Sequence, residues 1–373
     1  MKKVLLTATV QSHICQFHKP LVEVLHTLGY EVHVAARNNL AQKNGLALDF
    51  AECVFDVPFS RSPFSFQNVK AYKQLKEIIK AQGYSAVHCN TPVGGVLTRL
   101  ACRGQRKKGM QVLYTAHGFH FCKGAPIKNW LYYPIEWICA RWTDRLITIT
   151  KEDYALATRH FKTNVCHIHG VGANQARYFP IPDTKRESLR QTYGIPSDCR
   201  LVLCVGELLP NKNQKTVVAA MSLVAKAYPN TLLCIAGNGP CESALREQIA
   251  SLDLSEHVRL LGYTTRLHDY CGMSDVVVSC SYREGLPMNV VEAMLCAKPI
   301  VASDNRGHRE LIEHGKTGYL VDADDVGAYA ERISALFDHP DTYEQMSKAA
   351  RNRAWIYTAE YVKPELEQIY QTL

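Results

Sequence analysis

The chain has 373 residues, which at ~150 residues per domain predicts two to three domains with ordinary hydrophobic cores. A hydrophobic fraction of 47% and a charged fraction of 21% exclude a disordered chain, and no apolar run reaches the ~18 residues of a membrane-spanning helix. The formal charge of +8 is uneven, because residues 1–180 carry 23 Lys and Arg against 10 Asp and Glu, whereas residues 181–373 carry 20 against 25. A basic half is typical of a domain that meets nucleic acid, an anionic membrane surface or a phosphorylated substrate.

Short β-branched runs alternate with longer amphipathic segments in the first half of the chain. The N-terminal run MKKVLLTATV has no cleavage-site pattern after it and predicts a first strand instead of a signal peptide. Further strands are expected at residues 31–37, 53–58, 86–90, 111–117 and 145–150, and helices at 17–28, 66–82, 93–103, 126–141 and 152–160. Because the strands are apolar without alternation, they predict a parallel sheet that is covered on both faces.

A proline-containing stretch at residues 178–199 interrupts this pattern and predicts a linker at about 180–185. A second alternating series follows, with the strands RLVLCVG, TLLCIAG, VRLLG, DVVVSCS, PIVAS and GYLV. The chain is therefore expected to form two Rossmann-like, doubly wound α/β domains, at residues 1–182 and 183–356. Ligands of such sheets bind beyond the carboxyl ends of the strands, and two facing domains would make a cleft.

The fourteen cysteines contain no Cys-x-x-Cys pair, and many of them lie in strand-like apolar runs. Free cysteine behaves there as a small hydrophobic residue, and zinc ligation by closely spaced cysteines is excluded. This usage predicts a reduced protein of the cytoplasm.

Glycine patterns disfavour two common nucleotide sites. The first strand ends without G-x-G-x-x-G, which disfavours a dinucleotide cofactor, and no P-loop sequence is present. The acidic run DADD at residues 322–325 contains Asp-x-Asp, but it precedes a helix and is interpreted as an N-terminal capping region in preference to a metal site.

The strongest signal is REGLPMNVVEAMLCAKPIVAS, at residues 283–303, directly after an apolar strand. Glu284 lies before a helix that is expected to begin near Met288, and Glu292 lies about one turn inside it. The free backbone N–H groups of a helix N-terminus favour a phosphate, so an acid, an anion site and a second acid follow in order. This order matches a nucleotide-sugar, although acids early in a helix also balance the helix dipole.

This segment resembles the E-x7-E signature of the retaining glycosyltransferases of family 4, which have the GT-B fold. The similarity covers nearly the whole chain, through AGNGP (236–240), HIHGVGANQARYFP (167–180) and DNRGHRELIEHGKTGYLVDADD (304–325). The first half is similar to a subgroup that builds exopolysaccharide, capsule or related surface glycans. The resemblance implies that a last helix, at about residues 357–373, packs back on the first domain.

The resemblance implies roles for residues that match the family's motifs. Glu292 would bind ribose hydroxyls, Glu284 would face the transferred sugar, and Lys212 would neutralise the leaving diphosphate. The remaining donor contacts in the second domain would come from Leu286, Pro287, Met288, Asn289 and Gly206. The chain departs from the family at Glu207, where arginine is common, and this acid must point away from a diphosphate or pair with Lys212.

Histidines of the first domain are also implicated. His117, at the carboxyl end of a predicted strand, would contact the donor sugar, and Ser12 and His13 would lie in a loop near the phosphate or the acceptor. His18 and His120 are interpreted as structural. The stretch 119–142 mixes aromatic residues with Lys123, Lys128 and Arg141, which suits either a membrane interface or a core helix with capping charges.

The sequence therefore predicts transfer of a sugar, with retention, from a nucleotide-diphosphate donor, most simply UDP, to a glycan or lipid-diphosphate-linked acceptor. No cofactor, metal or nucleic acid is expected to take part, and the enzyme would lie in the cytoplasm, in possible contact with the inner face of an anionic membrane. A sugar-nucleotide epimerase and a non-catalytic nucleotide-sugar-binding protein stay open as alternatives. The sugar, the base and the acceptor are not specified by these motifs.

Overall fold

The computed structural model describes residues 2–43, 46–122 and 125–373. Two units of parallel β-sheet and helices make up the chain, one formed by residues 1–172 and 359–373 and the other by residues 173–358. Apolar strands that alternate with helices fold in this way because each crossover helix covers a face of the sheet. Each unit has its own sheet and its own core.

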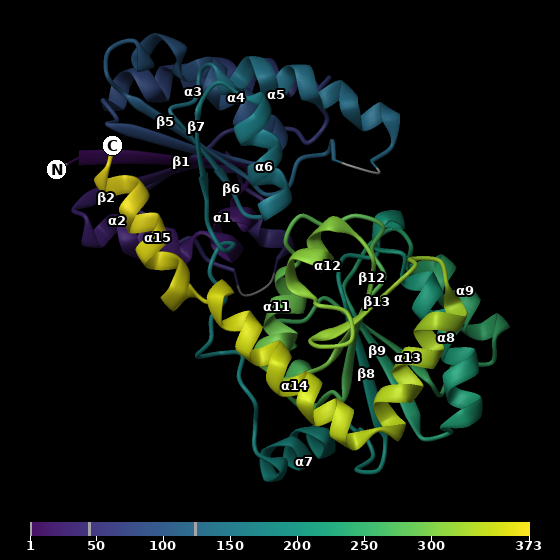
Figure 1. The fold of residues 1–373 in the computed structure, drawn as a ribbon. Helices are drawn as coiled ribbons and strands as arrows, with labels where there is room; N and C mark the ends of the chain where they lie inside the picture. The colour runs from purple at the N-terminus through teal and green to yellow at the C-terminus, as the bar shows by residue number, and fades with distance from the viewer. Residues whose placement is uncertain (1, 44–45, 123–124) are drawn as a thin grey trace. The chain divides into compact units, whose positions relative to one another are not determined.

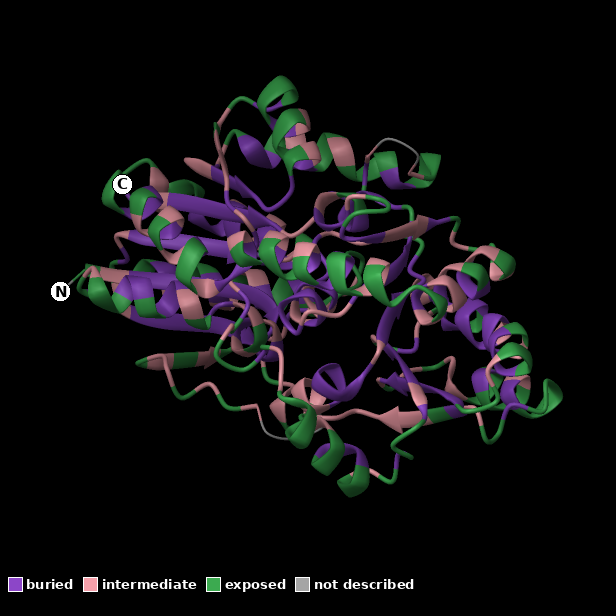
Figure 2. Ribbon diagram, turned by 60° about the horizontal axis from the view of Figure 1, so that its bottom comes forward, coloured by how far each residue is buried: buried purple, intermediate pink, exposed green. Residues whose placement is uncertain are grey.

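The first unit contains a seven-stranded parallel sheet with the order β3-β2-β1-β4-β5-β6-β7 (Figure 1). Its strands are β1 (Lys2–Val10), β2 (Tyr30–Arg37), β3 (Cys53–Asp56), β4 (Ala86–Asn90), β5 (Gln111–Ala116), β6 (Arg145–Thr148) and β7 (Asn164–His167). The central strands β1 and β4 are buried almost throughout, which explains their lack of polar alternation (Figure 2).

Helices cover both faces of this sheet. They are α1 (Gln11–Phe17), α2 (Lys19–Thr27), α3 (Gln67–Gln82), α4 (Pro92–Arg106), α5 (Tyr132–Ala140), α6 (Lys151–His160) and α15 (Ala359–Gln371), with short 3-10 turns η1 (Leu40–Gln42) and η2 (Ile127–Leu131). Helix α15 packs beside α2, and the Tyr370 hydroxyl lies 2.7 Å from Nδ1 of the buried His88 on β4 (Figure 1). The C-terminal helix thus belongs to the first unit.

The second unit has a six-stranded parallel sheet with the order β10-β9-β8-β11-β12-β13. The strands are β8 (Arg200–Val205), β9 (Thr231–Ala236), β10 (Val258–Gly262), β11 (Val276–Ser279), β12 (Ile300–Ser303) and β13 (Gly318–Val321). The helices are α7 (Asp183–Thr192), α8 (Gln214–Ala227), α9 (Glu242–Ser251), α10 (Leu267–Met273), α11 (Met288–Leu295), α12 (Arg306–Leu311), α13 (Val326–Asp338) and α14 (Pro340–Ala354), with 3-10 turns η3 (Pro210–Lys212) and η4 (Trp355–Tyr357).

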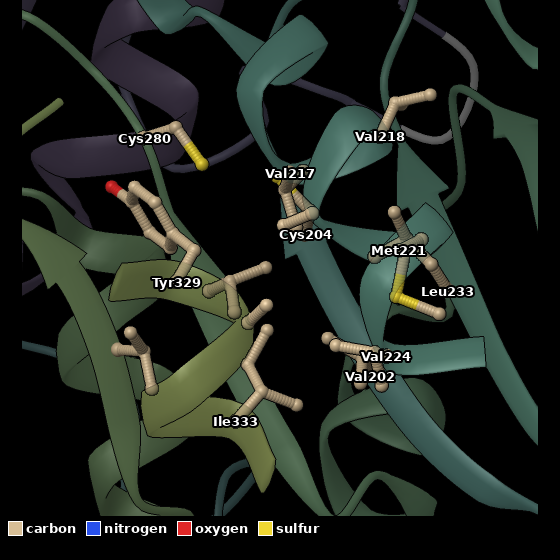
Figure 3. Close-up of a cluster of buried hydrophobic side chains, with 14 of the residues drawn as sticks. Val202, Cys204, Val217, Val218, Met221, Val224, Leu233, Cys280, Tyr329 and Ile333 are labelled. Atoms are coloured by element: carbon tan, nitrogen blue, oxygen red, sulfur yellow. The ribbon is translucent and has the colours of Figure 1, made fainter. Parts of the chain in front are cut away.

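The core of the second unit lies between the sheet and the layer of α8, α9 and α13. Val202 and Cys204 of β8 meet Met221 of α8 and Ile333 of α13 in this cluster, and Cys280 lies near the ring of Tyr329 (Figure 3). Burial raises the pKa of the Cys204 thiol to about 12, so this side chain is an uncharged apolar group, as its place in a strand-like run predicts.

All twelve strands and most helices expected from the sequence are present. The sequence does not predict β7, α7 or α10, because these segments are short or carry mixed polar and apolar residues. It also placed Ser12 and His13 in a loop, whereas both lie in the first turn of α1, which follows β1 without a connection. The boundary between the two units falls between residues 172 and 173, whereas the sequence predicts it between 182 and 183. Helix α15 begins at Ala359.

No helix of the described residues is both long and apolar enough to cross a membrane.

Candidate functional site

Helix α11 and the loop before it hold the acidic pair that the sequence singled out. The helix begins at Met288, as expected, so that Glu284 lies in the loop and Glu292 is the fifth residue of the helix. The backbone N–H groups of Val290 and Val291 donate to the Pro287 carbonyl. Those of Met288 and Asn289 have no hydrogen-bond partner among the described residues, and such free helix-end N–H groups attract anions.

Lys212 and Glu284 form an ion pair at this loop. Nζ of Lys212 lies 2.5 Å from Oε1 of Glu284, and the two side chains are 23% and 12% exposed. Lys212 ends the 3-10 turn η3 after β8, and Glu284 follows β11, the neighbouring strand. The carboxyl ends of these two parallel strands therefore bring a cation and an anion together beside the free N–H groups of α11.

Three asparagine contacts fix the loops that carry this pair. Asn211 Nδ2 donates to the Arg283 carbonyl at 3.0 Å, and the Asn211 carbonyl accepts from the Tyr282 N–H at 2.9 Å. Asn289 Nδ2 donates to the carbonyl of Val205 at 2.8 Å, which ties the start of α11 to the end of β8. The Asn289 side chain thus positions the helix, and its backbone N–H stays open for a ligand.

Glu292 lies in a different environment from Glu284. Burial raises the pKa of its carboxyl to about 7, although a hydrogen bond with Tyr178 and the positive charge of Arg177 act in the opposite direction. The pKa of the Tyr178 hydroxyl is also raised, mainly by burial and then by the Glu292 charge. Glu292 is therefore near the midpoint of its titration at neutral pH, and a group that donates hydrogen bonds to it would favour the ionised form.

The AGNGP turn follows β9 and requires glycine for close backbone packing. A Cβ atom at Gly237, which has φ +148°, would lie 2.0 Å from the carbonyl oxygen of Gly206. Gly206 in turn lies under Lys212, because a Cβ there would meet the Lys212 side chain at 3.5 Å. The glycines of the turn thus determine how the end of β8 and Lys212 are placed.

Gly307, the second residue of α12, packs directly on the Glu284 loop. A Cβ atom there would lie 2.4 Å from the Gly285 carbonyl oxygen and 2.7 Å from Cβ of Glu284. We expect Gly307→Ala to destabilise the protein by about 1–3 kcal/mol, because backbone atoms must move to accommodate the methyl group.

The control for this substitution is Gly327→Ala, at the second residue of the exposed start of α13, where the nearest atom to a new Cβ is 3.5 Å away. It should leave stability unchanged or raise it by up to about 1 kcal/mol. Thermal unfolding of both variants measures the difference. Equal melting temperatures would contradict the close packing of α12 on the loop.

Two acidic features have structural explanations. Asp325 caps α13 by accepting from the Ala328 N–H at 2.9 Å, and Asp324 accepts from the Tyr282 hydroxyl at 2.6 Å, so the capping interpretation of residues 322–325 is confirmed. Glu207 is exposed, while the ion pair of Lys212 is made with Glu284. The ion pair of Lys212 is therefore made with an acid 72 positions away in the chain.

The candidate residues of the first unit lie around the end of β1 and β5. Ser12 exchanges two hydrogen bonds with Asn39, since its N–H donates to Oδ1 at 3.0 Å and its Oγ accepts from Nδ2 at 2.8 Å. His13 and His117 meet edge to face, with their Nε2 atoms 3.4 Å apart. The structure brings these two histidines together although the chain separates them by 104 positions.

Several residues at these places were not identified from the sequence. Tyr178 reaches Glu292, Arg306 reaches the Glu284 carbonyl at 3.5 Å, and Asn39 holds Ser12. Arg306 could have been identified from the sequence, because it precedes Gly307 in a segment that resembles a family motif. Tyr178 likewise lies in the quoted segment 167–180, whereas Asn39 belongs to none of the quoted motifs.

Two family models match the chain. Residues 185–353 match glycosyl transferases group 1, and residues 3–150 match glycosyl transferase 4-like. The chain is 41% identical to EpsD of Bacillus subtilis, a glycosyltransferase by name, over 99% of this chain and 96% of that protein. It is 25% identical, over 82% of this chain and 80% of the relative, to an Escherichia coli enzyme named UDP-Gal:alpha-D-GlcNAc-diphosphoundecaprenol alpha-1,3-galactosyltransferase.

Solved structures agree in fold. Sucrose-phosphate synthase of Thermosynechococcus elongatus superposes with a TM-score of 0.81 at 20% identity, over 100% of this chain and 99% of that one. HepE of Anabaena, in complex with UDP and glucose, superposes with a TM-score of 0.80 at 18% identity over 100% of both chains.

Proposed function

This chain belongs to glycosyltransferase family 4 and has the GT-B fold, and from that premise we propose that it transfers a sugar from a UDP-sugar to a glycan or lipid-diphosphate-linked acceptor during synthesis of a surface polysaccharide. The observation that carries the donor assignment is the Lys212–Glu284 ion pair beside the free N–H groups of α11. The name of the Escherichia coli relative specifies a UDP-sugar and a lipid-diphosphate acceptor, and HepE binds UDP, which supports the same chemistry here. The reported relatives give the epimerase and the non-catalytic alternatives no support.

The donor would bind in three parts. The diphosphate is held by Lys212 and by the N–H groups of Met288 and Asn289, where charge and helix-end dipoles act together. Glu292 accepts hydrogen bonds from the ribose hydroxyls, and Glu284 faces the transferred sugar. Leu286 and Pro287 are buried and shape the turn between the two acids, and Gly206 leaves room for Lys212.

The transfer itself would proceed with retention of the anomeric configuration. The acceptor hydroxyl oxygen forms a bond to the anomeric carbon on the face from which UDP departs, the bond from that carbon to the phosphate oxygen breaks, and the phosphate takes the hydroxyl proton. Lys212 and the helix N–H groups stabilise the charge that grows on the diphosphate, so neither a cofactor nor a metal ion is required. His117 would contact the transferred sugar, and His13 with Ser12 would contact the phosphate or the acceptor.

The decisive experiment combines binding and transfer. The chain is mixed with UDP-, GDP- and ADP-sugars in a thermal-shift panel, because a ligand of the folded state stabilises it by mass action. The stabilising donor is then incubated with lipid-diphosphate acceptors, and NMR of the product reports its anomeric configuration. Stabilisation by a UDP-sugar and a retained product are expected, whereas an inverted product or no response to any nucleotide would refute the proposal.

We also propose peripheral contact with an anionic membrane through the segment η2–α5, at the cytoplasmic face where the donor would be met. Ile127 and Leu131 are 90% and 73% exposed, and Trp130, Ile135 and Ile138 are each more than 40% exposed. The opposite side of α5 is anchored by Glu136, whose Oε2 lies 2.9 Å from the buried Arg99 guanidinium. An anchored helix with apolar residues outside and basic residues nearby suits a membrane interface. Lys123 lies outside the described residues.

Replacing Ile127 and Leu131 together with serine should reduce binding to phosphatidylglycerol vesicles by at least about tenfold, because two apolar side chains would no longer enter the interface. Vesicle cosedimentation measures this loss. The matched control is Phe64→Ser with Phe66→Ser, which removes two apolar residues elsewhere that are at least as exposed and should not change binding. Equal losses in both double variants would argue against a specific membrane surface.

A further inference from the structure

Three histidines of the first unit converge on one point. His13 lies in the first turn of α1, His18 lies between α1 and α2, and His117 follows β5. One ring nitrogen from each lies within 4.8 Å of the others. Among the described residues, this is the cluster of three or more His, Cys, Asp or Glu side chains that could hold a metal ion. The ring centroids are 4.7–5.5 Å apart, so the three rings surround a common centre.

The spacing is close to that of a tetrahedral metal site. Two imidazole nitrogens bound to zinc at 2.0–2.1 Å lie about 3.3–3.4 Å apart at a tetrahedral angle. Nε2 of His13 and Nε2 of His117 are already 3.4 Å apart. The other pairs of ligand nitrogens lie within 4.8 Å and need to approach by at most about 1.4 Å to reach this spacing.

His18 supplies a second and independent observation. Its side chain is 3% exposed, and its Nε2 is buried without a hydrogen-bond partner. A buried nitrogen with no partner costs about 1–3 kcal/mol, so such atoms are rare in folded proteins unless a ligand satisfies them. A purely structural role, which the sequence suggested for His18, leaves this nitrogen unexplained.

The three rings are also in the protonation state that a metal requires. Burial lowers the pKa of His117 to about 4, and it holds the pKa values of His13 and His18 well below 6.5, so all three are neutral at pH 7 and offer lone pairs. Three features oppose binding. The Nε2 atoms of His13 and His117 are within hydrogen-bond distance of each other, so one of them carries a proton that must move to Nδ1 when metal binds. Asn90 Oδ1 lies 3.0 Å from His117 Nε2, so that ring must carry its proton on Nδ1 when it binds metal, and the exposed Arg61 adds a positive charge near His13.

We propose that His13, His18 and His117 form a binding site for one divalent cation of the late first-row type, such as Zn²⁺. Neutral imidazoles suit these ions, and three protein ligands leave a fourth position for water or an oxygen ligand. Because His13 and His117 are the residues assigned to the sugar or acceptor, the bound cation would inhibit transfer reversibly. This consequence for activity rests on the proposed function, whereas the binding itself does not.

The test uses the full chain and Co²⁺, which replaces Zn²⁺ and has visible absorption. Titration should give one equivalent of tetrahedral Co²⁺ bands that one equivalent of Zn²⁺ abolishes. The absence of thiolate-to-cobalt charge transfer would exclude the cysteines as ligands. Loss of transfer on adding Zn²⁺ and its recovery with a chelator would then connect the site to activity. Binding without inhibition would retain the metal site and contradict the roles proposed for His13 and His117.

His18→Gln separates the metal site from the transfer reaction. It should weaken Co²⁺ binding by at least about tenfold and leave metal-free transfer unchanged, because His18 is assigned no contact with donor or acceptor. The matched control is His33→Gln, another buried histidine, which is bonded to Tyr84 and Glu31 and lies outside the cluster. It should bind Co²⁺ as the parent does. No Co²⁺ bands with the parent chain, or equal affinity in His18→Gln, would overturn the proposal.

Discussion

Lys212→Met and Glu284→Gln should change UDP affinity in opposite directions while both reduce sugar transfer. Methionine removes the cation that faces the diphosphate, so the affinity for UDP should fall and kcat should fall by about 100-fold or more, as for the loss of one donor to a developing oxyanion. Glutamine removes the negative charge 2.5 Å from Lys212 and frees its ammonium for phosphate, so the affinity for UDP should rise. Calorimetric titration with UDP gives the affinities, and transfer assays give kcat.

The same pair should couple in stability. Lys212→Met leaves the Glu284 carboxylate, which is 12% exposed, without its ionic partner, and this costs more than the loss of a surface ion pair. The double variant Lys212→Met with Glu284→Gln should therefore be more stable than Lys212→Met alone. Urea unfolding of the parent, both single variants and the double variant completes a double-mutant cycle. If the effects on stability are additive, or if both single substitutions change the UDP affinity in the same direction, the two side chains act independently.

Glu292→Gln should stabilise the protein at pH 8 and at the same time weaken UDP binding. The carboxyl has a pKa of about 7 in the folded protein against 4.5 in an unfolded chain, so folding favours its protonated form. The stability that this proton confers is complete below pH 4.5 and is lost as the pH rises through 7. Glutamine resembles the protonated form at every pH. The variant should therefore gain up to about 3 kcal/mol over the parent at pH 8 and nothing near pH 4.5.

Binding should show the opposite dependence on pH. Ribose hydroxyls donate to the ionised carboxylate, so UDP binding releases a proton and the parent's affinity should increase from pH 6 to pH 8. Glutamine lacks the charge, and the variant should lose about 10- to 100-fold in affinity at pH 8, the value of hydrogen bonds to a charged group. Calorimetry at several pH values in buffers of different ionisation enthalpy detects the released proton. A pH-independent affinity of the parent would contradict ribose binding by Glu292.

Patterns of neighbouring residues predicted the domain architecture of this protein and part of its candidate site. The alternation of apolar strands with amphipathic helices predicted two parallel-sheet domains. Amphipathic helices bury one face with a helical period, whereas strands covered on both faces are apolar throughout. The spacing of Glu284 and Glu292 about a helix start was likewise local, since a turn and one helical turn separate them. Lys212 and the glycines of the AGNGP turn were identified for the same reason, because each lies in a motif of neighbouring residues.

Only the tertiary structure decided which charges meet and what environment each acid has. Lys212 and Glu284 are 72 positions apart and pair because two neighbouring strands end at the same edge of a sheet. From the sequence, Glu207 was expected either to point away from a diphosphate or to pair with Lys212, whereas in the structure Glu207 is exposed and Lys212 pairs with Glu284. The difference between Glu284, which has a cation beside it, and Glu292, whose carboxyl is buried against Tyr178, also depends on packing. The histidine cluster joins residues 104 positions apart, and neither local spacing nor composition encodes a contact of that kind.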